Sequence, residues 1–228
     1  MREIVKKNDA VYLVDKNGVR KISFFSNGSY YKLKAIDGNT APTLEINEIH
    51  MHRVKEVTPW EDSQMKVSAL KILNGDHVLD IYTGLGYTAI ISLNHNVSRV
   101  TTIEKDLNVL RIAELNPWSR KLANEKIQLI LGDAFKILKN FKDESFDKII
   151  HDPPPRFSLA GEPYSLEFYR EMYRILKRNG RVFHYIGFPG EKYRRKNILK
   201  GVSNRMSKIG FLIEKKLNIG GVVAKKKS

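Results

Sequence analysis

The 228-residue sequence contains no cysteine. Without thiols there can be neither a disulfide framework nor a thiolate zinc site, and nothing argues for secretion. No run of about 18 apolar residues occurs, so no membrane span is expected. The first ten residues, MREIVKKNDA, are charged and lack the apolar region of a signal peptide. We therefore expect a cytoplasmic protein without a membrane partner.

Acidic residues are scarce relative to basic ones. The chain has 40 Lys and Arg against 25 Asp and Glu, which gives a formal net charge of +15. An extended polyanion such as nucleic acid is the natural partner of so unbalanced a charge. The alternative is a lysine-rich surface of a thermophilic protein, but such surfaces usually balance Lys with Glu. The charge therefore favours nucleic acid.

Residues 1–57 differ in pattern from the rest of the chain. The stretch AVYLVDKNGVRKISFF contains two alternating runs around Asn17-Gly18, which is a strong hairpin signal. More β-prone runs follow, so residues 1–57 predict a small β-rich module. Its aromatic and basic side chains could bind RNA by stacking and charge, or the aromatics could simply fill a small β core. The residues concerned are Phe24, Phe25, Tyr30, Tyr31, Lys32 and Lys34.

A second domain is predicted over residues 58–228. Thr58 is a helix-capping residue and Pro59 suits the first turn, so a helix is expected to open this domain. From residue 76 onward, strands and helices alternate over short connections. This alternation predicts an α/β fold, a doubly wound, largely parallel Rossmann-like sheet. Strands are expected at 77–83, 99–106, 126–134, 146–152 and 180–187, followed by a basic helix and a final β pair.

Three of these strands end on acidic residues. Asp80 ends the first and is followed by Gly84 and Gly86, which let the backbone pass close to a ligand at a helix N-terminus. Glu104 ends the second, where a carboxylate can accept from both hydroxyls of a ribose. Asp133 ends the third and can accept from the amino group of adenine. The predicted cofactor-binding residues are Asp80, Tyr82, Thr83, Gly84, Gly86, Tyr87, Glu104, Lys105, Asp133, Ala134 and Phe135.

The fourth strand separates two kinds of cofactor. The glycine loop alone leaves a dinucleotide open, because Ala89 stands where a third glycine is expected and is tolerated there. However, the fourth strand runs into HDPPP at residues 151–155, beside the predicted ligand. Such a rigid, donor-free backbone after a carboxylate indicates a reaction centre at this point.

The whole series of motifs resembles the class I S-adenosylmethionine-dependent methyltransferases over most of residues 60–228. It consists of D-x-x-x-G-x-G from Asp80, the strand-terminal Glu104, G-D-A around Asp133, and D-P-P from Asp152. Asp-Pro-Pro followed by an aromatic is similar to the motif of enzymes that methylate nitrogens conjugated to a planar system. HDPPPRF with a short β-rich N-terminal module resembles a predicted archaeal methyltransferase family. That resemblance implies S-adenosylmethionine as cofactor and cytidine N4 of ribosomal RNA as target, with adenine N6 and guanine N2 as alternatives.

The chemistry of Asp-Pro-Pro fits such a reaction. An exocyclic amine is a poor nucleophile, and the Asp152 carboxylate and the Pro153 carbonyl can accept its two N–H bonds and redirect its lone pair. The activated methyl donor requires no metal. The base must leave its stack, and an aromatic wall normally receives it. Here Pro155 stands in the aromatic position, so Phe157 or Pro155 itself is expected to face the base, with Tyr82 or Tyr87 of the glycine loop as further candidates. The predicted catalytic residues are Asp152, Pro153, Pro154, Pro155 and Phe157.

A basic segment between residues 192 and 208 predicts contact with RNA phosphates, with a solvated helix face as the alternative. The predicted nucleic-acid-binding residues are Lys192, Arg194, Arg195 and Lys196. The histidines have no other potential metal ligands at a suitable spacing, so they are expected to be packed in the core or to lie on the surface. They are His50, His52, His151 and His184.

Three other functions remain open. Aminopropyltransferases share the cofactor chemistry and the fold, but their cationic amine substrates need acidic pockets, which a chain at +15 serves poorly. A protein-glutamine methyltransferase would more typically have Asn in place of Asp152 and would have less need of a basic surface. An RNA-binding module with a retired cofactor site would be expected to lose its glycine loop. The sequence carries no signal for the oligomeric state.

Overall fold

The computed structural model describes residues 9–154, 161–187, 192–217 and 219–227. For residues 192–197 and 215–217 it describes the backbone alone. Pro155 and Phe157, two of the predicted catalytic residues, therefore lie outside the described residues, as do the side chains of the four predicted phosphate contacts.

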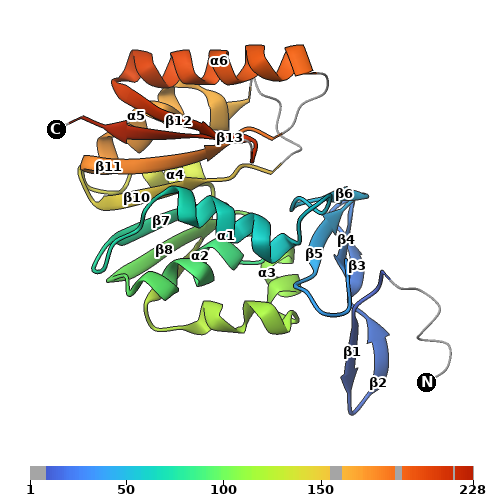
Figure 1. Ribbon diagram of the computed structural model, residues 1–228. Coiled ribbons are helices and arrows are strands. Elements are labelled where there is room, and N and C mark those ends of the chain that lie inside the picture. Colours follow the sequence, from blue (N-terminus) through green and yellow to red (C-terminus); the bar gives the residue numbers. More distant parts are fainter. Residues whose placement is uncertain (1–8, 155–160, 188–191, 218, 228) are drawn as a thin grey trace.

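A seven-stranded sheet forms the centre of the molecule (Figure 1). Its strand order is β12-β13-β11-β10-β7-β8-β9. The five central and edge strands β7 to β11 run parallel, and β13 is antiparallel to both β11 and β12. Their bounds are β7 His77–Ile81, β8 Arg99–Glu104, β9 Ile127–Leu131, β10 Phe146–His151, β11 Leu176–Tyr185, β12 Phe211–Leu217 and β13 Gly221–Lys226. The predicted α/β Rossmann-like sheet is confirmed.

Helices cover both faces of this sheet (Figure 1). On one face lie α1 (Pro59–Ala69), α2 (Tyr87–Ser92) and α3 (Leu107–Glu114), with the short helices η2 (Leu93–His95) and η3 (Pro117–Ala123). On the other lie α4 (Ala134–Leu138), α5 (Leu166–Ile175) and α6 (Lys192–Ile209), with η4 (Glu162–Tyr164) between strand and helix. Each face has its own apolar core, as expected for a sheet covered on both sides.

Helix α1 begins where the sequence predicts. Thr58 is its N-cap, and a capping box joins the Thr58 hydroxyl to the Glu61 backbone N–H and the Glu61 carboxylate to the Thr58 N–H. Such a box satisfies two otherwise unpaired N–H groups and fixes where the helix starts. Pro59 occupies the first turn without losing a hydrogen bond. This start orients the buried face of α1, which carries Asp62 and Lys66.

The N-terminal part forms two small antiparallel sheets. One is the hairpin β1 (Tyr12–Asp15) with β2 (Gly18–Lys21), whose two-residue turn is Lys16-Asn17, so the predicted Asn17-Gly18 pair spans the last turn residue and the first residue of β2. The other contains β3 (Ser23–Ser26), β4 (Ser29–Lys34), β5 (Thr43–Ile46) and β6 (Ile49–His50) in that order. The predicted β-rich character of this segment agrees with the structure, whereas a domain boundary at residue 57 stays a prediction.

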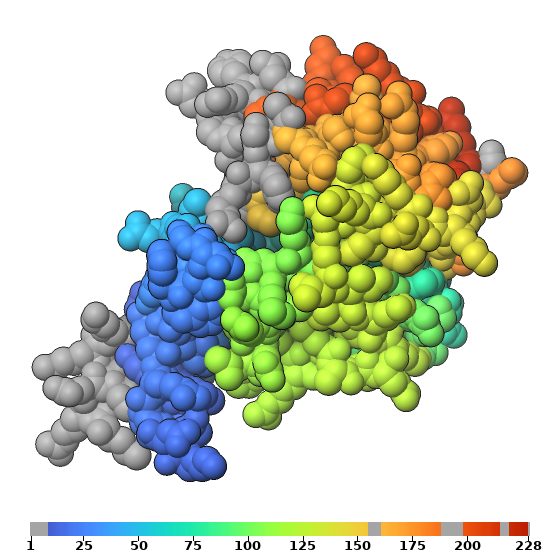
Figure 2. Space-filling model, turned by 180° about the vertical axis from the view of Figure 1, so that it is seen from behind, coloured from blue at the N-terminus to red at the C-terminus, as the bar shows by residue number. Residues whose placement is uncertain are grey.

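The four-stranded N-terminal sheet packs against the larger half (Figures 1 and 2). Its apolar residues Leu33 and Leu44 belong to the same core cluster as Val67 of α1 and Tyr87 of α2. This sheet lies beside the carboxyl ends of the parallel strands, where ligands bind in open α/β sheets. It therefore contributes a wall to whatever binds there.

Strand alternation sorts the aromatic residues of β3 and β4 into two pairs. Phe24 and Tyr31 are cross-strand partners with ring centroids 5.4 Å apart, and Tyr31 is buried in the core. Phe25 and Tyr30 are the neighbouring pair and are 70% and 39% exposed. The pair Phe24 and Tyr31 thus packs in the core, whereas the pair Phe25 and Tyr30 is exposed to solvent. RNA binding by this module stays a prediction.

Candidate active site

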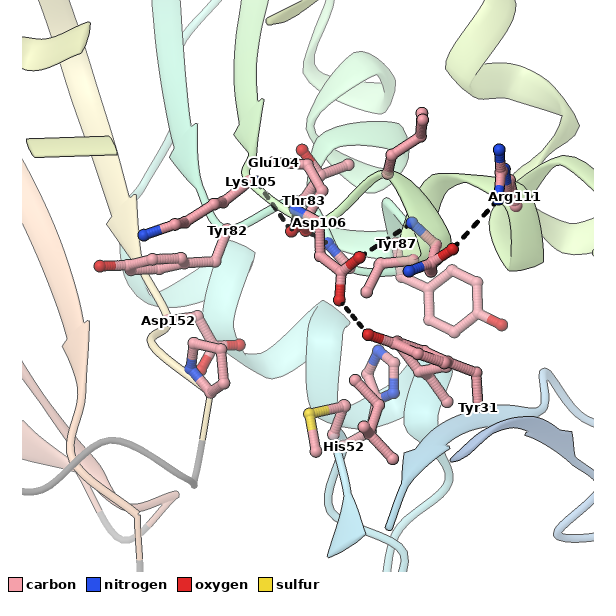
Figure 3. A pocket seen from close by; sticks show the side chains of 18 of the residues that line it. Tyr31, His52, Tyr82, Thr83, Tyr87, Glu104, Lys105, Asp106, Arg111 and Asp152 are labelled. Atoms are coloured by element: carbon pink, nitrogen blue, oxygen red, sulfur yellow. Dashed lines mark hydrogen bonds between the residues drawn. The ribbon is translucent and has the colours of Figure 1, made fainter. Parts of the chain in front are cut away.

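A cavity of about 940 Å³ lies between the carboxyl ends of β7, β8 and β10 and the N-terminal sheet (Figure 3). The large half contributes the loop after β7, the residues after β8 and the residues after β10. The N-terminal sheet contributes Tyr31, Leu44 and Ile46. Eight of the residues predicted to bind the cofactor or to take part in catalysis line this cavity. They are Tyr82, Thr83, Gly84, Tyr87, Glu104, Lys105, Asp152 and Pro154.

The loop after β7 has a strained, close-packed backbone. Tyr82, Gly84 and Gly86 all have positive φ angles, of 76°, 55° and 77°. A positive φ is unusual for a bulky residue such as Tyr82 and is found mostly where surrounding structure enforces it, often at functional sites. A Cβ at Gly86 would approach the Leu122 side chain to 2.4 Å. Gly86 is therefore required for packing against η3, and Gly84 shapes the loop beside the cavity.

Glu104 is held at the end of β8 by backbone N–H groups. Its Oε2 accepts from Gly84 N at 3.0 Å, and its Oε1 accepts from the N–H groups of Lys105 and Asp106 at 2.8 and 2.9 Å. Burial raises the pKa of Glu104, and these three hydrogen bonds oppose the rise. A carboxylate has about four acceptor positions, so Glu104 retains capacity for a ligand hydroxyl. The hydrogen bond from Gly84 thus joins the glycine loop to Glu104 without any ligand.

Asp80 has a structural position beneath the cavity. It is fully buried, and its two carboxylate oxygens accept from the hydroxyls of Thr88 in α2 and Thr102 in β8 at 2.8 and 2.9 Å. Burial raises the pKa of Asp80 to about 7, against the effect of these two hydrogen bonds. Asp80 is not among the described residues that line the cavity. It fixes α2 and the glycine loop to β8, so a direct role in cofactor binding stays a prediction.

Asp133 is engaged by neighbouring groups at the start of α4. Its carboxylate caps α4 by accepting from Lys136 N, and it accepts from Lys105 Nζ at 2.8 Å. The Lys105 ammonium lowers the pKa of Asp133. The ring of Phe135 stacks on Phe168, with centroids 5.8 Å apart. Asp133, Ala134 and Phe135 are absent from the cavity lining in the described part of the chain. Their contact with adenine stays a prediction.

Asp152 follows β10 and lines the cavity from the side opposite Glu104 (Figure 3). Its Oδ2 accepts a hydrogen bond of 2.6 Å from Nζ of Lys66, which is buried in α1. Burial raises the pKa of Asp152, and the Lys66 ammonium acts against that rise. Pro153 is buried beside Asp152 and Pro154 reaches the cavity. The carboxylate is therefore anchored on one oxygen and presented to the cavity by a rigid segment.

Lys66 belongs to a buried group of charges that the sequence analysis did not identify. Its Nζ lies 2.7 Å from Asp62 Oδ2 as well as 2.6 Å from Asp152, and 4.3 Å from the centroid of the Tyr185 ring. Arg53 lies 3.6 Å from the other oxygen of Asp62. Burial alone would lower the pKa of Lys66, but the two carboxylates raise it above its usual value. Lys66 is therefore a buried ammonium ion.

Tyr31 and His52 are two further residues at the cavity that sequence reasoning did not assign to it (Figure 3). Tyr31 Oη donates to Asp106 Oδ2 at 2.6 Å. His52 Nδ1 and Thr43 Oγ1 lie 3.0 Å apart, and burial lowers the pKa of His52 to about 3. A neutral imidazole and a tyrosine thus line the wall formed by the N-terminal part.

Two other histidines are packed behind Asp152. The rings of His151 and His184 stack with centroids 4.3 Å apart, and both residues are fully buried. His184 Nε2 lies 2.9 Å from Tyr169 Oη.

Within the described residues there is no cluster of three or more metal-ligating side chains. In the same residues, none of the helices has the length and apolar character needed to cross a bilayer.

The chain has a Rossmann-like methyltransferase fold. A solved spermidine synthase from Thermotoga maritima is similar to this chain with a TM-score of 0.67 at 20% identity, covering 99% of this chain and 84% of that one. A Methanococcus maripaludis protein classed with S-adenosylmethionine-dependent methyltransferases gives a TM-score of 0.53 at 19% identity, over 73% of this chain and 84% of that one. The likeness establishes the fold.

The chain belongs to the spermine/spermidine synthase domain family, whose model matches residues 62–217. An uncharacterized Methanocaldococcus jannaschii protein, MJ1233, is 49% identical over 227 residues, which are 99% of this chain and 77% of that protein. The ribosomal RNA large subunit methyltransferase I of Photobacterium profundum is 30% identical over 113 residues. Those residues are 49% of this chain and 28% of that enzyme. The finer resemblance to a cytidine-methylating family stays a prediction.

Proposed function

We propose that this protein transfers the methyl group of S-adenosylmethionine to an exocyclic amino nitrogen of an RNA base, with cytidine N4 of ribosomal RNA as the expected target. The observation that carries the proposal is Asp152, a carboxylate that is anchored through one oxygen and lines the cavity of about 940 Å³ just after β10. The cavity also contains Glu104 and the glycine loop, which suit a ribose and an amino-acid moiety. Adenine N6, guanine N2 and a glutamine amide are alternative acceptors.

Different residues of the chain would bind the cofactor and the acceptor amine. S-adenosylmethionine supplies an activated methyl group when bound. Glu104 and the loop from Tyr82 to Gly84 would hold its nucleoside, and the apolar wall of Leu44 and Ile46 would exclude water. Asp152 Oδ1 and the Pro153 carbonyl would accept the two N–H bonds of the target amine, which directs its lone pair toward the methyl group. The methylated nitrogen would lose one proton to Asp152, which would pass it to solvent, with S-adenosylhomocysteine as the leaving group.

The distribution of charge supports RNA as the substrate. Residues 176–228 contain 15 Lys and Arg and two Asp and Glu, a balance of 15 − 2 = +13 out of the +15 of the whole chain. This basic segment includes α6, which follows β11, a neighbour of the Asp152-bearing strand β10. A polyanion that reaches the cavity across this side would gain phosphate contacts. Lys192, Arg194, Arg195 and Lys196 at the start of α6 are the proposed contacts.

Aminopropyl transfer is the second candidate, favoured by the family to which the chain belongs. Its acceptor is a cationic amine, which binds best among unpaired carboxylates. In this cavity, Asp152 is paired with Lys66, Asp106 accepts from Tyr31, and Glu104 accepts three backbone N–H groups. Two cations also line the cavity: Lys105, which is paired with Asp133, and Arg111, which donates to Asn108. The local electrostatics thus favour a neutral acceptor on RNA.

One experiment separates these functions. Purified protein is incubated either with methyl-tritiated S-adenosylmethionine and total RNA, DNA and protein, or with labelled decarboxylated S-adenosylmethionine and putrescine. We expect label in the RNA pool of the first reaction and no labelled polyamine in the second. Label in protein alone, or in none of the pools, would refute RNA methylation. Formation of spermidine at a comparable rate would establish the second candidate.

A further inference from the structure

We infer that Lys66 is a positioning residue that makes the acceptor site selective for an uncharged nitrogen and rejects cationic amines. The inference rests on the proposed function, since it concerns the acceptor that Asp152 binds. Lys66 does not line the cavity itself. It acts through Asp152, whose Oδ2 it holds at 2.6 Å from a position that is 1% exposed.

The charge arithmetic of the buried group supports this role. Two carboxylates, Asp62 and Asp152, face two cations, Lys66 and Arg53, so the four formal charges cancel. A methyl-acceptor molecule that approaches Asp152 therefore meets a carboxylate whose negative charge is already neutralised by Lys66. A neutral aromatic amine needs only a hydrogen-bond acceptor, which Asp152 Oδ1 provides. An alkylammonium needs an uncompensated negative charge, and it would be repelled by the Lys66 ammonium behind Asp152.

The surroundings of Lys66 oppose its loss of charge. The carboxylates of Asp62 and Asp152 lie within 2.7 Å of Nζ, and the Tyr185 ring lies 4.3 Å from it, where its face attracts a cation. Removing one member of a buried ion pair leaves an uncompensated charge, which is costly. The arrangement thus keeps Lys66 protonated, and with it the balance at Asp152.

Lys66 also fixes which oxygen of Asp152 is available. Because Oδ2 is committed to Nζ, Oδ1 is the atom assigned to the acceptor. Lys66 comes from α1 whereas Asp152 follows β10, and the two are 86 residues apart in sequence. The capping box at Thr58 sets the start of α1 and hence the rotation that places Lys66 beside Asp152. The orientation of the carboxylate therefore depends on a helix outside the predicted motifs.

The test is the binding of putrescine, a dicationic diamine, measured by calorimetry in the presence of S-adenosylhomocysteine. The wild-type protein should show no saturable binding of the diamine. Lys66→Met should bind it, with an affinity at least on the order of tenfold above any wild-type value, because Asp152 then lacks its counter-charge. In transfer assays with RNA, the same variant should lose kcat while its KM for S-adenosylmethionine is retained.

Lys66→Gln serves as a second variant in case Lys66→Met does not fold. The amide keeps a donor beside both carboxylates but removes the charge, so it should also gain diamine binding. The matched control is Lys148→Met. Lys148 is also buried but lies on β10, and its Nζ is 3.2 Å from Asp76 Oδ2. That control should not bind putrescine, since Asp76 and Lys148 are not among the cavity lining.

Three results would overturn the inference. They are saturable binding of putrescine by the wild-type protein, absence of binding by a folded Lys66→Met or Lys66→Gln variant, and equal binding by Lys148→Met. None of these depends on methyl transfer, because binding is measured without a methyl donor. Failure of RNA methylation by the wild-type protein would instead refute the proposed function.

Discussion

Tyr31 Oη donates a 2.6 Å hydrogen bond to Asp106 Oδ2, which ties strand β4 of the N-terminal sheet to the first turn of α3. Asp106 is the N-cap of that helix, and its other oxygen accepts from Asn108 N. Both residues line the cavity. The N-terminal sheet is thus bound to the larger half at the cavity itself, so this contact contributes both to the wall of the cavity and to the attachment of the sheet.

Tyr31→Phe removes this contact without changing the ring. Because the acceptor is a carboxylate, we expect the free energy of unfolding to fall by about 1.5–3 kcal/mol. Chemical denaturation followed by circular dichroism measures it. The control is Tyr30→Phe, at the neighbouring and more exposed position, which should change stability by less than about 0.5 kcal/mol. Equal effects of the two substitutions would contradict a specific role for the Tyr31–Asp106 bond.

Asp152→Asn keeps the shape of the side chain but removes its charge and its proton-accepting oxygen. We expect the transfer rate to fall by about 100-fold or more, in the range for loss of a positioned general base. Binding of S-adenosylhomocysteine, measured by calorimetry, should persist. Asp147→Asn is the matched control, because Asp147 lies on β10, the strand that precedes Asp152, and pairs with Lys177 instead. Unimpaired transfer by Asp152→Asn would show that another residue holds the acceptor.

Charge reversal at the start of α6 tests the proposed RNA contacts. Arg194→Glu with Arg195→Glu should raise the KM for RNA several-fold and reduce its salt dependence, because phosphate contacts release counterions. The KM for S-adenosylmethionine should not change. The same reversal at Arg120 and Lys121, two exposed residues on η3, is the control. An unchanged KM for RNA in the Arg194/Arg195 variant would refute these contacts.

Buried histidines should make the fold sensitive to acid. Burial lowers the pKa of His184 from 6.5 to about 3. The unfolded chain therefore binds a proton below about pH 6.5 that the folded state excludes, so the His184 contribution is complete above pH 6.5 and is lost between pH 6.5 and 3. His184→Gln should flatten the fall of the unfolding free energy over this range, in denaturation at several pH values.

The sequence predicted the sheet well because its strands have distinct boundaries. The strands that end on Asp80, Glu104 and Asp152 were located from β-prone runs followed by glycine, acid or proline, and parallel strands bring such ends to one edge. The hairpin at Asn17-Gly18 and the helix start at Thr58 follow from local chemistry in the same way. Local signals were sufficient for the order of the main elements but not for every boundary, because β11 begins at Leu176 whereas a strand was expected from residue 180.

Pairings between distant side chains could not be predicted from such signals. Lys66 and Asp152 are 86 residues apart, and Tyr31 and Asp106 are 75 apart. The only local trace of the first pair is Asp62 four residues before Lys66, which reads as an ordinary helical ion pair. Asp133 shows the converse, because its strand-end position predicts a ligand contact while Lys105 and the N-terminus of α4 engage its carboxylate.

The most direct test of the account is nucleoside analysis of ribosomal RNA treated with the purified protein. RNA that lacks the modification is incubated with isotope-labelled S-adenosylmethionine and either the wild-type protein or Asp152→Asn, digested to nucleosides and analysed by mass spectrometry. We predict a labelled methyl group on the amino nitrogen of one nucleoside, expected to be cytidine N4, with the wild-type protein only. Label on carbon or ribose oxygen, or no label in RNA, would contradict the account.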